Sequence, residues 1–334
     1  MADATPVVTF CFRQRPIEQQ GVLEALREQG YTVIPYHEGP LDVKGTDILW
    51  LQGNPRWFPA LCRQLAALPR HARPLSVLWH HEPLPPPKAA GLPRPKLQAR
   101  EIVKILIRRR TINDVYGNAR ALQRLHERGI PDLLVVSTRA RQEFLMEQGI
   151  TAHWAPLGYW PIHGTDLGTA RDIPVLFLGD ACIPRRKKIL HGLRARGLAV
   201  QVAGSWSDPS FWGASRTRLL NRAKILLNLQ RNAGELAGLR FILGMANKAL
   251  VVSEPVYRPE PYIPGRHYVS AAVEDLPQVI SHYLAHDVER ERIALAGHGL
   301  VMDEVTIAKS VARIAAAIRT HGQELPMDRQ DGGE

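Results

Sequence analysis

The sequence predicts an α/β protein made of two doubly wound, parallel-sheet domains that face each other across a cleft. Short runs rich in Val, Ile and Leu alternate with longer amphipathic stretches, which is typical of strands joined by crossover helices. The chain has 334 residues, about twice the length of a typical domain. A segment containing proline and glycine, residues 158–172, interrupts the alternation and predicts a hinge.

In the first half, apolar runs predict strands, and apolar residues repeating every three or four positions predict helices. The expected strands are residues 7–12, 31–34, 47–51, 75–79, 133–136 and 152–155. The expected helices are residues 18–29, 56–68, 97–110, the stretch with apolar residues at 115, 119, 122 and 125, and a segment capped by Ser137 or Thr138. These elements form a first domain over residues 1–157.

In the second half the same alternation restarts and predicts a second domain over residues 173–302. Its expected strands are residues 175–178, 199–203, 225–229 and 249–253. Its expected helices are residues 187–196, 216–221, 239–247, 274–286 and a further one that begins at 287. An apolar stripe predicts a C-terminal helix over 303–321, and the polar residues 322–334 predict a disordered tail.

Composition and charge limit the classes of function. A formal net charge of +11 favours anionic partners such as nucleotide phosphates, nucleic acid or an acidic membrane surface. The three cysteines, Cys11, Cys62 and Cys182, are far apart and odd in number, which argues against a disulfide framework or a zinc site. Because the chain has no long apolar run and no signal-like start, we expect a cytoplasmic protein, with peripheral contact at the inner face of the membrane as an alternative.

The most informative stretch is residues 175–188, in which an apolar strand ends at Gly179 and four cations open the following helix. These cations are Arg185, Arg186, Lys187 and Lys188. Backbone N–H groups at a helix start, together with nearby cations, can hold a diphosphate. The alternative is a solvated basic helix start, but cations there oppose the helix dipole, and this favours an anionic partner.

The segment from 219 to 254 carries a family resemblance. The run AKILLNL at 223–229, the pair Arg240-Phe241 before a helix, and LVVSE at 250–254 resemble the C-terminal half of the GT-B glycosyltransferases. The similarity is to the CgeB-like, group 1 branch, which the FLG strand end before Pro184-Arg185 and the APLG at 155–158 also fit. It covers roughly residues 133–318 and is strongest over 175–254.

The resemblance implies two Rossmann-like domains, with the acceptor bound by residues 1–157 and a nucleoside-diphosphate sugar bound by residues 173–302. It implies a hexosyltransferase of the retaining type that needs neither a metal nor another cofactor, and the absence of an Asp-x-Asp pair suits that expectation. Arg185 or Arg186, with Lys187 or Lys188, would stabilise the leaving diphosphate, and Lys248 would add to this charge.

Many retaining relatives carry two glutamates eight positions apart, near the donor sugar and near the ribose. Glu235 matches the first, and the second position is occupied by Leu243, which cannot accept a hydrogen bond from a ribose. Glu254, at the end of the next strand, is a candidate replacement. The alternatives are that Glu235 is a loop carboxylate facing water and that the protein is a catalytically silent member of the fold. Further candidates for the donor site, at a strand end and a helix start, are Asn228, Arg231 and Arg240.

In the first domain, His80 and His81 directly follow the strand at 75–79. A histidine there can orient an acceptor hydroxyl or act as general base, since its pKa lies near neutrality. The alternative is a strand end with one buried histidine. A metal site is less favoured, because adjacent side chains point to opposite sides of a strand.

The stretch from Arg100 to Arg110 is strongly basic beside an apolar stripe. It has three interpretations: an ordinary solvated face, a patch that contacts an acceptor or an anionic membrane, or a nucleic-acid-binding segment, although no recognisable nucleic-acid-binding module is present. The corresponding alternative function is a basic surface-binding protein that acts on an acidic membrane or on nucleic acid through this stretch. The sequence does not identify the nucleotide, the sugar, the acceptor or the oligomeric state.

Overall fold

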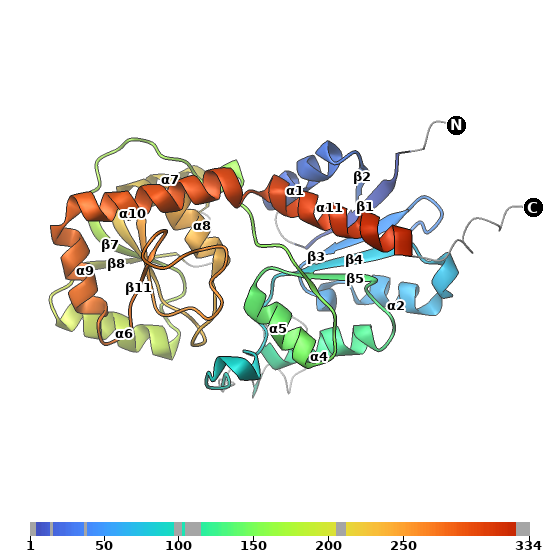
Figure 1. The fold of residues 1–334 in the computed structure, drawn as a ribbon, viewed down its shortest axis with the longest axis horizontal. Coiled ribbons are helices and arrows are strands. Elements are labelled where there is room, and N and C mark those ends of the chain that lie inside the picture. Colours follow the sequence, from blue (N-terminus) through green and yellow to red (C-terminus); the bar gives the residue numbers. More distant parts are fainter. Residues whose placement is uncertain are drawn as a thin grey trace, which may run out of the picture. The chain divides into compact units, whose positions relative to one another are not determined.

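The computed structural model describes residues 5–13, 16–36, 39–96, 102–103, 115–204 and 212–324. It divides the chain into two compact units (Figure 1). Unit 1 comprises Met1–Ala155 and Ile307–Glu334, and unit 2 comprises Pro156–Thr306. The segment predicted as a hinge, residues 158–172, therefore falls within unit 2.

Unit 1 is built on one six-stranded parallel sheet with the order β2-β1-β3-β4-β5-β6. Its strands are β1 Val7–Cys11, β2 Thr32–Pro35, β3 Ile48–Gln52, β4 Leu75–His80, β5 Leu133–Val136 and β6 His153–Trp154. Its first four helices are α1 Pro16–Glu28, α2 Pro59–Ala67, α4 Val115–His126 and α5 Arg139–Glu147. Each strand lies within two residues of its predicted position. β1, β3, β4 and β5 are short, mostly buried apolar runs, whereas β2 and β6 are only partly buried.

The core of unit 1 covers one face of this sheet with α2, α4 and α5. Leu61, Leu122 and Leu145 from these helices join one buried cluster with the strand residues Leu49 and Leu78. On the strands, alternate residues point to opposite faces, so Trp50 and Trp79 face the other way and are fully buried there. The sheet is therefore covered on both faces, as a parallel sheet requires.

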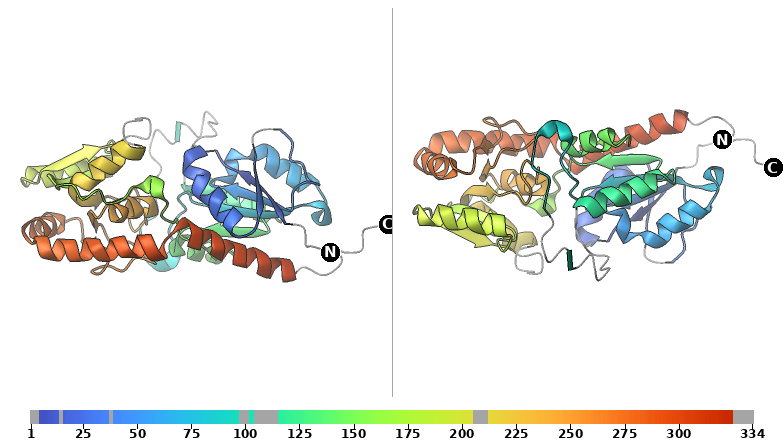
Figure 2. Two further views of the ribbon diagram at one scale, coloured as in Figure 1. Left: turned by 90° about the horizontal axis from the view of Figure 1, so that it is seen from above. Right: turned by 90° about the horizontal axis from the view of Figure 1, so that it is seen from below.

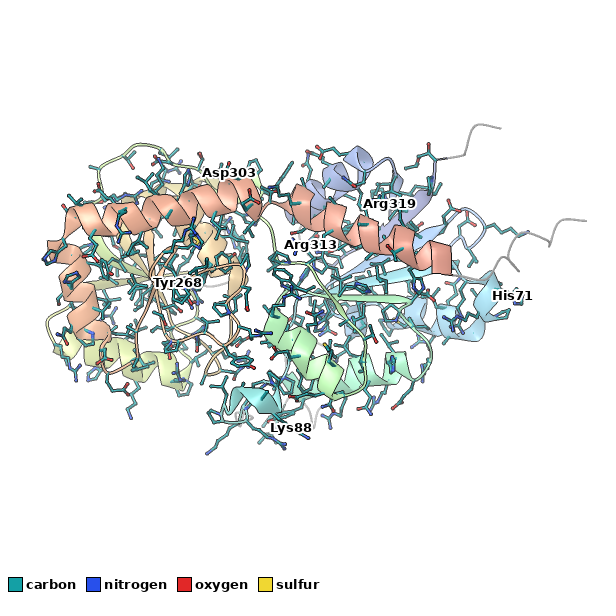
Figure 3. All side chains as sticks on the ribbon, in the orientation of Figure 1. His71, Lys88, Tyr268, Asp303, Arg313 and Arg319 are labelled. Carbon is teal, nitrogen blue, oxygen red and sulfur yellow. The ribbon has the colours of Figure 1, made fainter. Side chains whose placement is uncertain are left out.

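The C-terminal helix α11, Ile307–Glu324, belongs to unit 1, although it follows unit 2 in the sequence. It lies beside α1 in Figure 1, and both views of Figure 2 show it in the same unit. Arg313 of α11, labelled in Figure 3, stacks on the Trp154 ring at 4.8 Å, and Arg139 stacks on the same ring at 4.0 Å. The sequence predicts this helix, at 303–321, but not the unit that it completes.

Unit 2 is built on a five-stranded parallel sheet with the order β11-β10-β9-β7-β8. Its strands are β7 Ile173–Leu178, β8 Val200–Ala203, β9 Ala223–Asn228, β10 Leu250–Ser253 and β11 Val269–Ser270. Its helices are α6 Pro184–Ala195, α7 Gly213–Arg222, α8 Gly238–Ala246, α9 Leu276–Ala285 and α10 Asp287–Gly299, followed by the π-helical turn Leu300–Glu304. The two-residue β11 is not predicted, because it is too short to form an apolar run.

The helices of unit 2 cover both faces of its sheet. Leu190 of α6, Ile280 of α9 and Ile293 of α10 pack in one cluster on one face. Leu220 of α7 and Leu243 of α8 pack in another cluster with alternate strand residues. Together with unit 1, this confirms the predicted fold class of two doubly wound α/β domains.

The five strands of unit 2 have the same order as the first five strands of unit 1. In each unit the first strand lies between the second and the third, so the direction of winding reverses between β1 and β3 and between β7 and β9. In open α/β sheets, ligands bind at the carboxyl ends of the strands at this reversal point. Among the helices within the described ranges, none is long and apolar enough to cross a membrane.

We expect Gly244→Ala to destabilise unit 2. A Cβ atom at Gly244, on α8, would lie 2.6 Å from Cγ2 of Val251 and 3.0 Å from Cδ2 of Leu226. Because both neighbours are buried in the sheet, overpacking should cost about 1–3 kcal/mol of unfolding free energy, measured by urea denaturation.

Gly192→Ala is the matched control, because Gly192 is also inside a helix, α6, and has no atom within 4 Å of its added Cβ. There the substitution should stabilise by roughly 0.5–1 kcal/mol through its helix propensity. Equal effects at the two positions would contradict the close approach of α8 to the sheet.

Candidate functional site

The candidate site of unit 2 lies at the reversal point of its sheet, where β7 and β9 end. Two helices begin at this edge from opposite faces of the sheet, α6 at Pro184 and α8 at Gly238. Neither helix has a side-chain cap on its first N–H groups. Two uncapped helix N-termini carry partial positive charge and available donors, an arrangement suited to an anion.

Gly179, directly after β7, makes room for a side chain from α8. Its φ of +146° lies in a region that favours glycine, and an added Cβ would lie 3.1 Å from Nη2 of Arg240. The predicted importance of Gly179 therefore has a physical cause in the close approach of Arg240 to the strand end.

Arg240, in the first turn of α8, is fixed by the strand ends. Its Nε donates to the carbonyl of Leu178 at 3.1 Å, and its Nη1 donates to Oδ1 of Asn228 and to the carbonyl of Leu229. Burial and the neighbouring charge of Arg186 lower its pKa to about 9. A guanidinium whose pKa is lowered in this way is stabilised when an anion binds beside it.

Arg186, in the first turn of α6, approaches the same point and is 8% exposed. Its Nε donates to the carbonyl of Leu229 at 3.0 Å, and its Nη1 donates to the carbonyl of Asp180 at 3.3 Å. The guanidinium groups of Arg186 and Arg240 lie 5.7 Å and 5.5 Å from the Phe177 ring. Within the described residues, the Nη2 groups of both arginines make no hydrogen bond.

Arg185 and Glu254 form a bidentate ion pair. Nη1 of Arg185 donates to Oε1 of Glu254 at 2.8 Å, and Nη2 donates to Oε2. Glu254 is almost fully buried and also accepts from the backbone N–H of Gln230 at 2.9 Å. Its carboxylate is therefore occupied by protein donors, and we infer that it anchors α6 to β10 more than it contacts a ribose.

The remaining predicted residues of this edge differ in their exposure. Asn228 is fully buried and links Arg240 to Oγ of Ser253. Glu235 is part-exposed in the loop before α8, accepts from Asn232 at 3.2 Å, and raises the pKa of both Arg186 and Arg240. Arg231 is part-exposed in the same loop.

Three predicted cations are not brought into this cluster. Lys187 and Lys188 are exposed on α6. Lys248 follows α8 and precedes β10, at the amino edge of the sheet, where it forms an ion pair with Asp166 at 2.9 Å. The expectation that Lys248 contacts the leaving diphosphate is therefore corrected, since α8 carries the chain from the carboxyl edge to the opposite edge.

Leu243, the position of the second glutamate in many retaining relatives, lies in the core of unit 2. It is 5% exposed and packs with Leu176 and Leu226 between α8 and the sheet. A carboxylate at this position would be buried among apolar side chains, at a large desolvation cost. The substitution of leucine therefore fits the local packing.

The two predicted histidines of unit 1 have different environments. His80 is fully buried, and neither of its ring nitrogens has a hydrogen-bond partner in the described structure. Burial, with the charge of Arg141, holds its pKa well below the usual value. The expectation that His80 contacts an acceptor is therefore corrected, because its ring is enclosed by the core.

His81 is part-exposed, and burial of its ring with the charge of Arg141 lowers its pKa to about 3. A general base is most effective when its pKa lies near the working pH. The structure therefore favours a neutral hydrogen-bonding role for His81 over the general-base role among the predictions.

Several residues that shape these sites are missing from the sequence predictions. Gln230 is buried and bonds the carbonyls of Glu254 and Pro255 and the N–H of Gly234. Gln52, at the end of β3, contacts His81. Their signal in the sequence is only their position directly at or after a strand end.

The basic stretch from Arg100 to Arg110 lies almost entirely outside the described residues. Its two described members, Ile102 and Val103, are exposed. Its contact with a membrane or an acceptor stays a prediction. Within the described ranges, no group of three or more His, Cys, Asp or Glu is arranged to hold a metal ion.

Comparison with known proteins gives one family match, over residues 185–316, to the family described as glycosyl transferase-like. No curated protein matches the sequence of the chain. The match begins at Arg185 and includes Arg186, Arg240 and Glu254, so it contains most of the candidate site.

Solved structures match over most of the chain. Sucrose-phosphate synthase from Thermosynechococcus elongatus has a TM-score of 0.63 and 14% identity, covering 96% of this chain and 100% of that one. HepE of Anabaena, in complex with UDP and glucose, has a TM-score of 0.58 and 14% identity, covering 95% and 100%. TarM has a TM-score of 0.55 and 12% identity over 82% of this chain, which spans only 54% of TarM.

These identities are low, so the solved structures establish the fold and not the activity. The family match covers the C-terminal part of the chain and most of unit 2. The protein therefore has the GT-B fold of two Rossmann-like units, and its residues 185–316 match the glycosyl transferase-like family.

Proposed function

We propose that the protein transfers a sugar from a nucleoside-diphosphate sugar to an acceptor, with the diphosphate bound between α6 and α8 of unit 2. The observation that carries this proposal is the pair of neighbouring guanidinium groups, Arg186 and Arg240, at two helix N-termini that lack a side-chain cap. Their Nη2 groups make no hydrogen bond to any residue that the structure describes. The family match over residues 185–316 and the UDP bound to HepE support the same function.

The electrostatics of the cluster suit a diphosphate. Arg186 is buried and Arg240 is part-buried beside it, so desolvation and the charge of Arg186 lower the pKa of Arg240. Glu235 and Glu254 offset the repulsion only in part. A diphosphate would bring negative charge that balances the two arginines. Its oxygens would accept charge-assisted hydrogen bonds from their Nη2 groups.

The same groups would accelerate the reaction. As the bond between sugar and diphosphate breaks, negative charge accumulates on the leaving group, and donors already in place stabilise it without reorganising. We propose that this role makes the reaction independent of a metal ion. We further propose transfer of a hexose with retention at the anomeric carbon, supported by the family resemblance and by Glu235 in the loop before α8. The acceptor would bind to unit 1.

We expect one of UDP, GDP, ADP, CDP and dTDP to raise the thermal unfolding midpoint in the presence of EDTA. At 100 times its dissociation constant, a ligand stabilises the folded state by about 2.7 kcal/mol. Arg240→Met should weaken nucleotide binding about ten- to a hundredfold, because one charge-assisted hydrogen bond contributes roughly 1.5–3 kcal/mol. Titration calorimetry measures this difference.

Two matched variants control for charge and for folding. Lys187→Met removes an exposed cation of α6, and Arg222→Met removes an exposed arginine paired with Asp172. Both should leave the nucleotide affinity within about a factor of three, since exposed ion pairs contribute little. An equal loss in Lys187→Met and Arg240→Met, or no stabilisation by any nucleotide, would contradict the site.

Glu235→Gln should separate binding from transfer. Its charge acts on Arg186 and Arg240, so its removal should leave the affinity for the nucleoside diphosphate unchanged or tighter. If Glu235 lies by the donor sugar, release of nucleoside diphosphate from UDP-glucose or GDP-mannose should slow about tenfold or more. Glu274→Gln, an exposed carboxylate of the same unit, is the control.

The anomeric configuration of the product, observed by proton NMR, tests the proposed retention. An inverted product would contradict it. Nucleotide binding without turnover of any nucleotide sugar would instead favour the catalytically silent alternative.

A further inference from the structure

A second site, at the carboxyl edge of unit 1, contains a hydrogen-bond chain that ends at His81. Nε1 of Trp50 donates to Oε1 of Gln52 at 2.9 Å, and Nε2 of Gln52 lies 2.5 Å from Nε2 of His81. Trp50 and Gln52 are both buried. The Trp79 ring packs edge-on against the His81 ring, with centroids 4.8 Å apart, and restricts its rotation.

The chemistry of these groups fixes the direction of every hydrogen bond. An indole N–H can only donate, so the Gln52 oxygen must face Trp50 and the Gln52 amide must face His81. The amide NH₂ can only donate, so Nε2 of His81 must accept. In a neutral imidazole with an accepting Nε2, the hydrogen lies on Nδ1.

The imidazole is neutral because its environment disfavours a second proton. Burial, followed by the charge of Arg141, holds the pKa of His81 at about 3. The neighbouring His80 adds no positive charge, because burial, with the charges of Arg141 and His81, lowers its own pKa. At physiological pH the ring is therefore a fixed Nδ1–H donor.

This donor has no partner within the described part of the chain. Nδ1 of His81 is covered from solvent and makes no hydrogen bond. A buried donor left without an acceptor costs about 1–3 kcal/mol, which a ligand oxygen would recover on binding. The strand end of β4 places this donor next to Gln52 at the end of β3, at the sheet edge where α/β proteins bind ligands.

We propose that the Trp50–Gln52 pair fixes His81 as an Nδ1–H donor, and that this N–H binds a hydroxyl oxygen of a sugar at the carboxyl edge of unit 1. The identity of the ligand rests on the proposed sugar transfer, but the tautomer does not. His81 is then a substrate-contacting residue, and Gln52 and Trp50 are positioning residues that act through it.

The tautomer is tested first, by long-range proton–nitrogen NMR of the protein labelled with ¹⁵N-histidine. His81→Asn identifies the His81 signals. We expect a pyrrole-type Nδ1 and a pyridine-type Nε2 throughout pH 5–8. Hydrogen on Nε2, or a ring that takes up a second proton within this range, would overturn the proposal whatever the protein's activity is.

The ligand is tested by adding UDP, UDP-glucose, GDP-mannose and free glucose to the same sample. We expect the Nδ1–H signal of His81 to move with a sugar-bearing ligand and not with UDP alone. A response to a nucleotide sugar assigns the donor's hydroxyl, and a response to free glucose assigns the acceptor's. A nucleotide sugar that binds, by calorimetry, without moving this signal, together with no response to free glucose, would overturn the ligand role; failure to bind any nucleotide would count against the proposed function instead.

Gln52→Glu tests the positioning residues. A carboxylate at position 52 can only accept, so it draws the hydrogen to Nε2 of His81, leaves Nδ1 as an acceptor and raises the pKa of the ring. We expect the NMR tautomer to switch, kcat/KM for transfer to fall about tenfold or more, and an ionisation to appear in the pH profile. Unchanged spectra and pH profile would contradict the inference.

Two further variants separate positioning from folding. Gln64→Glu makes the same change at a part-buried glutamine of unit 1 that bonds the backbone of Leu41, and it should leave the His81 tautomer intact. Trp50→Phe removes the donor that orients the Gln52 amide, so the two His81 tautomers should become mixed even in a fully folded protein. A single Nδ1–H tautomer in Trp50→Phe would overturn the role of Trp50.

Discussion

The structure depends on a constraint of parallel strands: every crossover helix must begin at the carboxyl edge of its sheet. In unit 2 the winding reverses between β7 and β9, so α6 and α8 start from opposite faces at the same place. Their first turns carry Arg186 and Arg240, which the strand-end carbonyls hold in position. The topology thus brings the two arginines together, and Gly179 leaves the space that the Arg240 side chain occupies.

The carboxyl edges of the two sheets differ in charge: unit 2 places arginines there, and unit 1 places uncharged histidines there. Unit 2 gathers guanidinium groups whose mutual repulsion an anion would relieve. In unit 1, burial beside the charge of Arg141 lowers the pKa of His80 and of His81, and Gln52 is the proposed hydrogen-bond partner that sets the tautomer of His81. The first arrangement suits a phosphate and the second suits a hydroxyl, the two kinds of group that the proposed sugar transfer would bring to the protein.

Much of the candidate site could be predicted, because strand ends and helix starts are visible in the sequence. Gly179, Arg186 and Arg240 each stand beside such a boundary. The separate functions of the four consecutive cations could not be predicted, since helical periodicity alone does not say that Arg186 turns inward and Lys187 outward at the sheet edge. The pairing of Arg185 with Glu254 joins residues far apart in the chain, and no local pattern reports it.

The sequence by itself determined the fold class and the positions of most strands, because short buried apolar runs are local signals. It also determined that the chain carries excess positive charge, part of it at a helix start after a strand. Tertiary structure decided that α11 completes unit 1, that Lys248 lies at the amino edge of the sheet, opposite the candidate site, and that His80 is enclosed by the core. These outcomes depend on contacts between segments distant in sequence, and only the packed chain specifies which distant side chains meet.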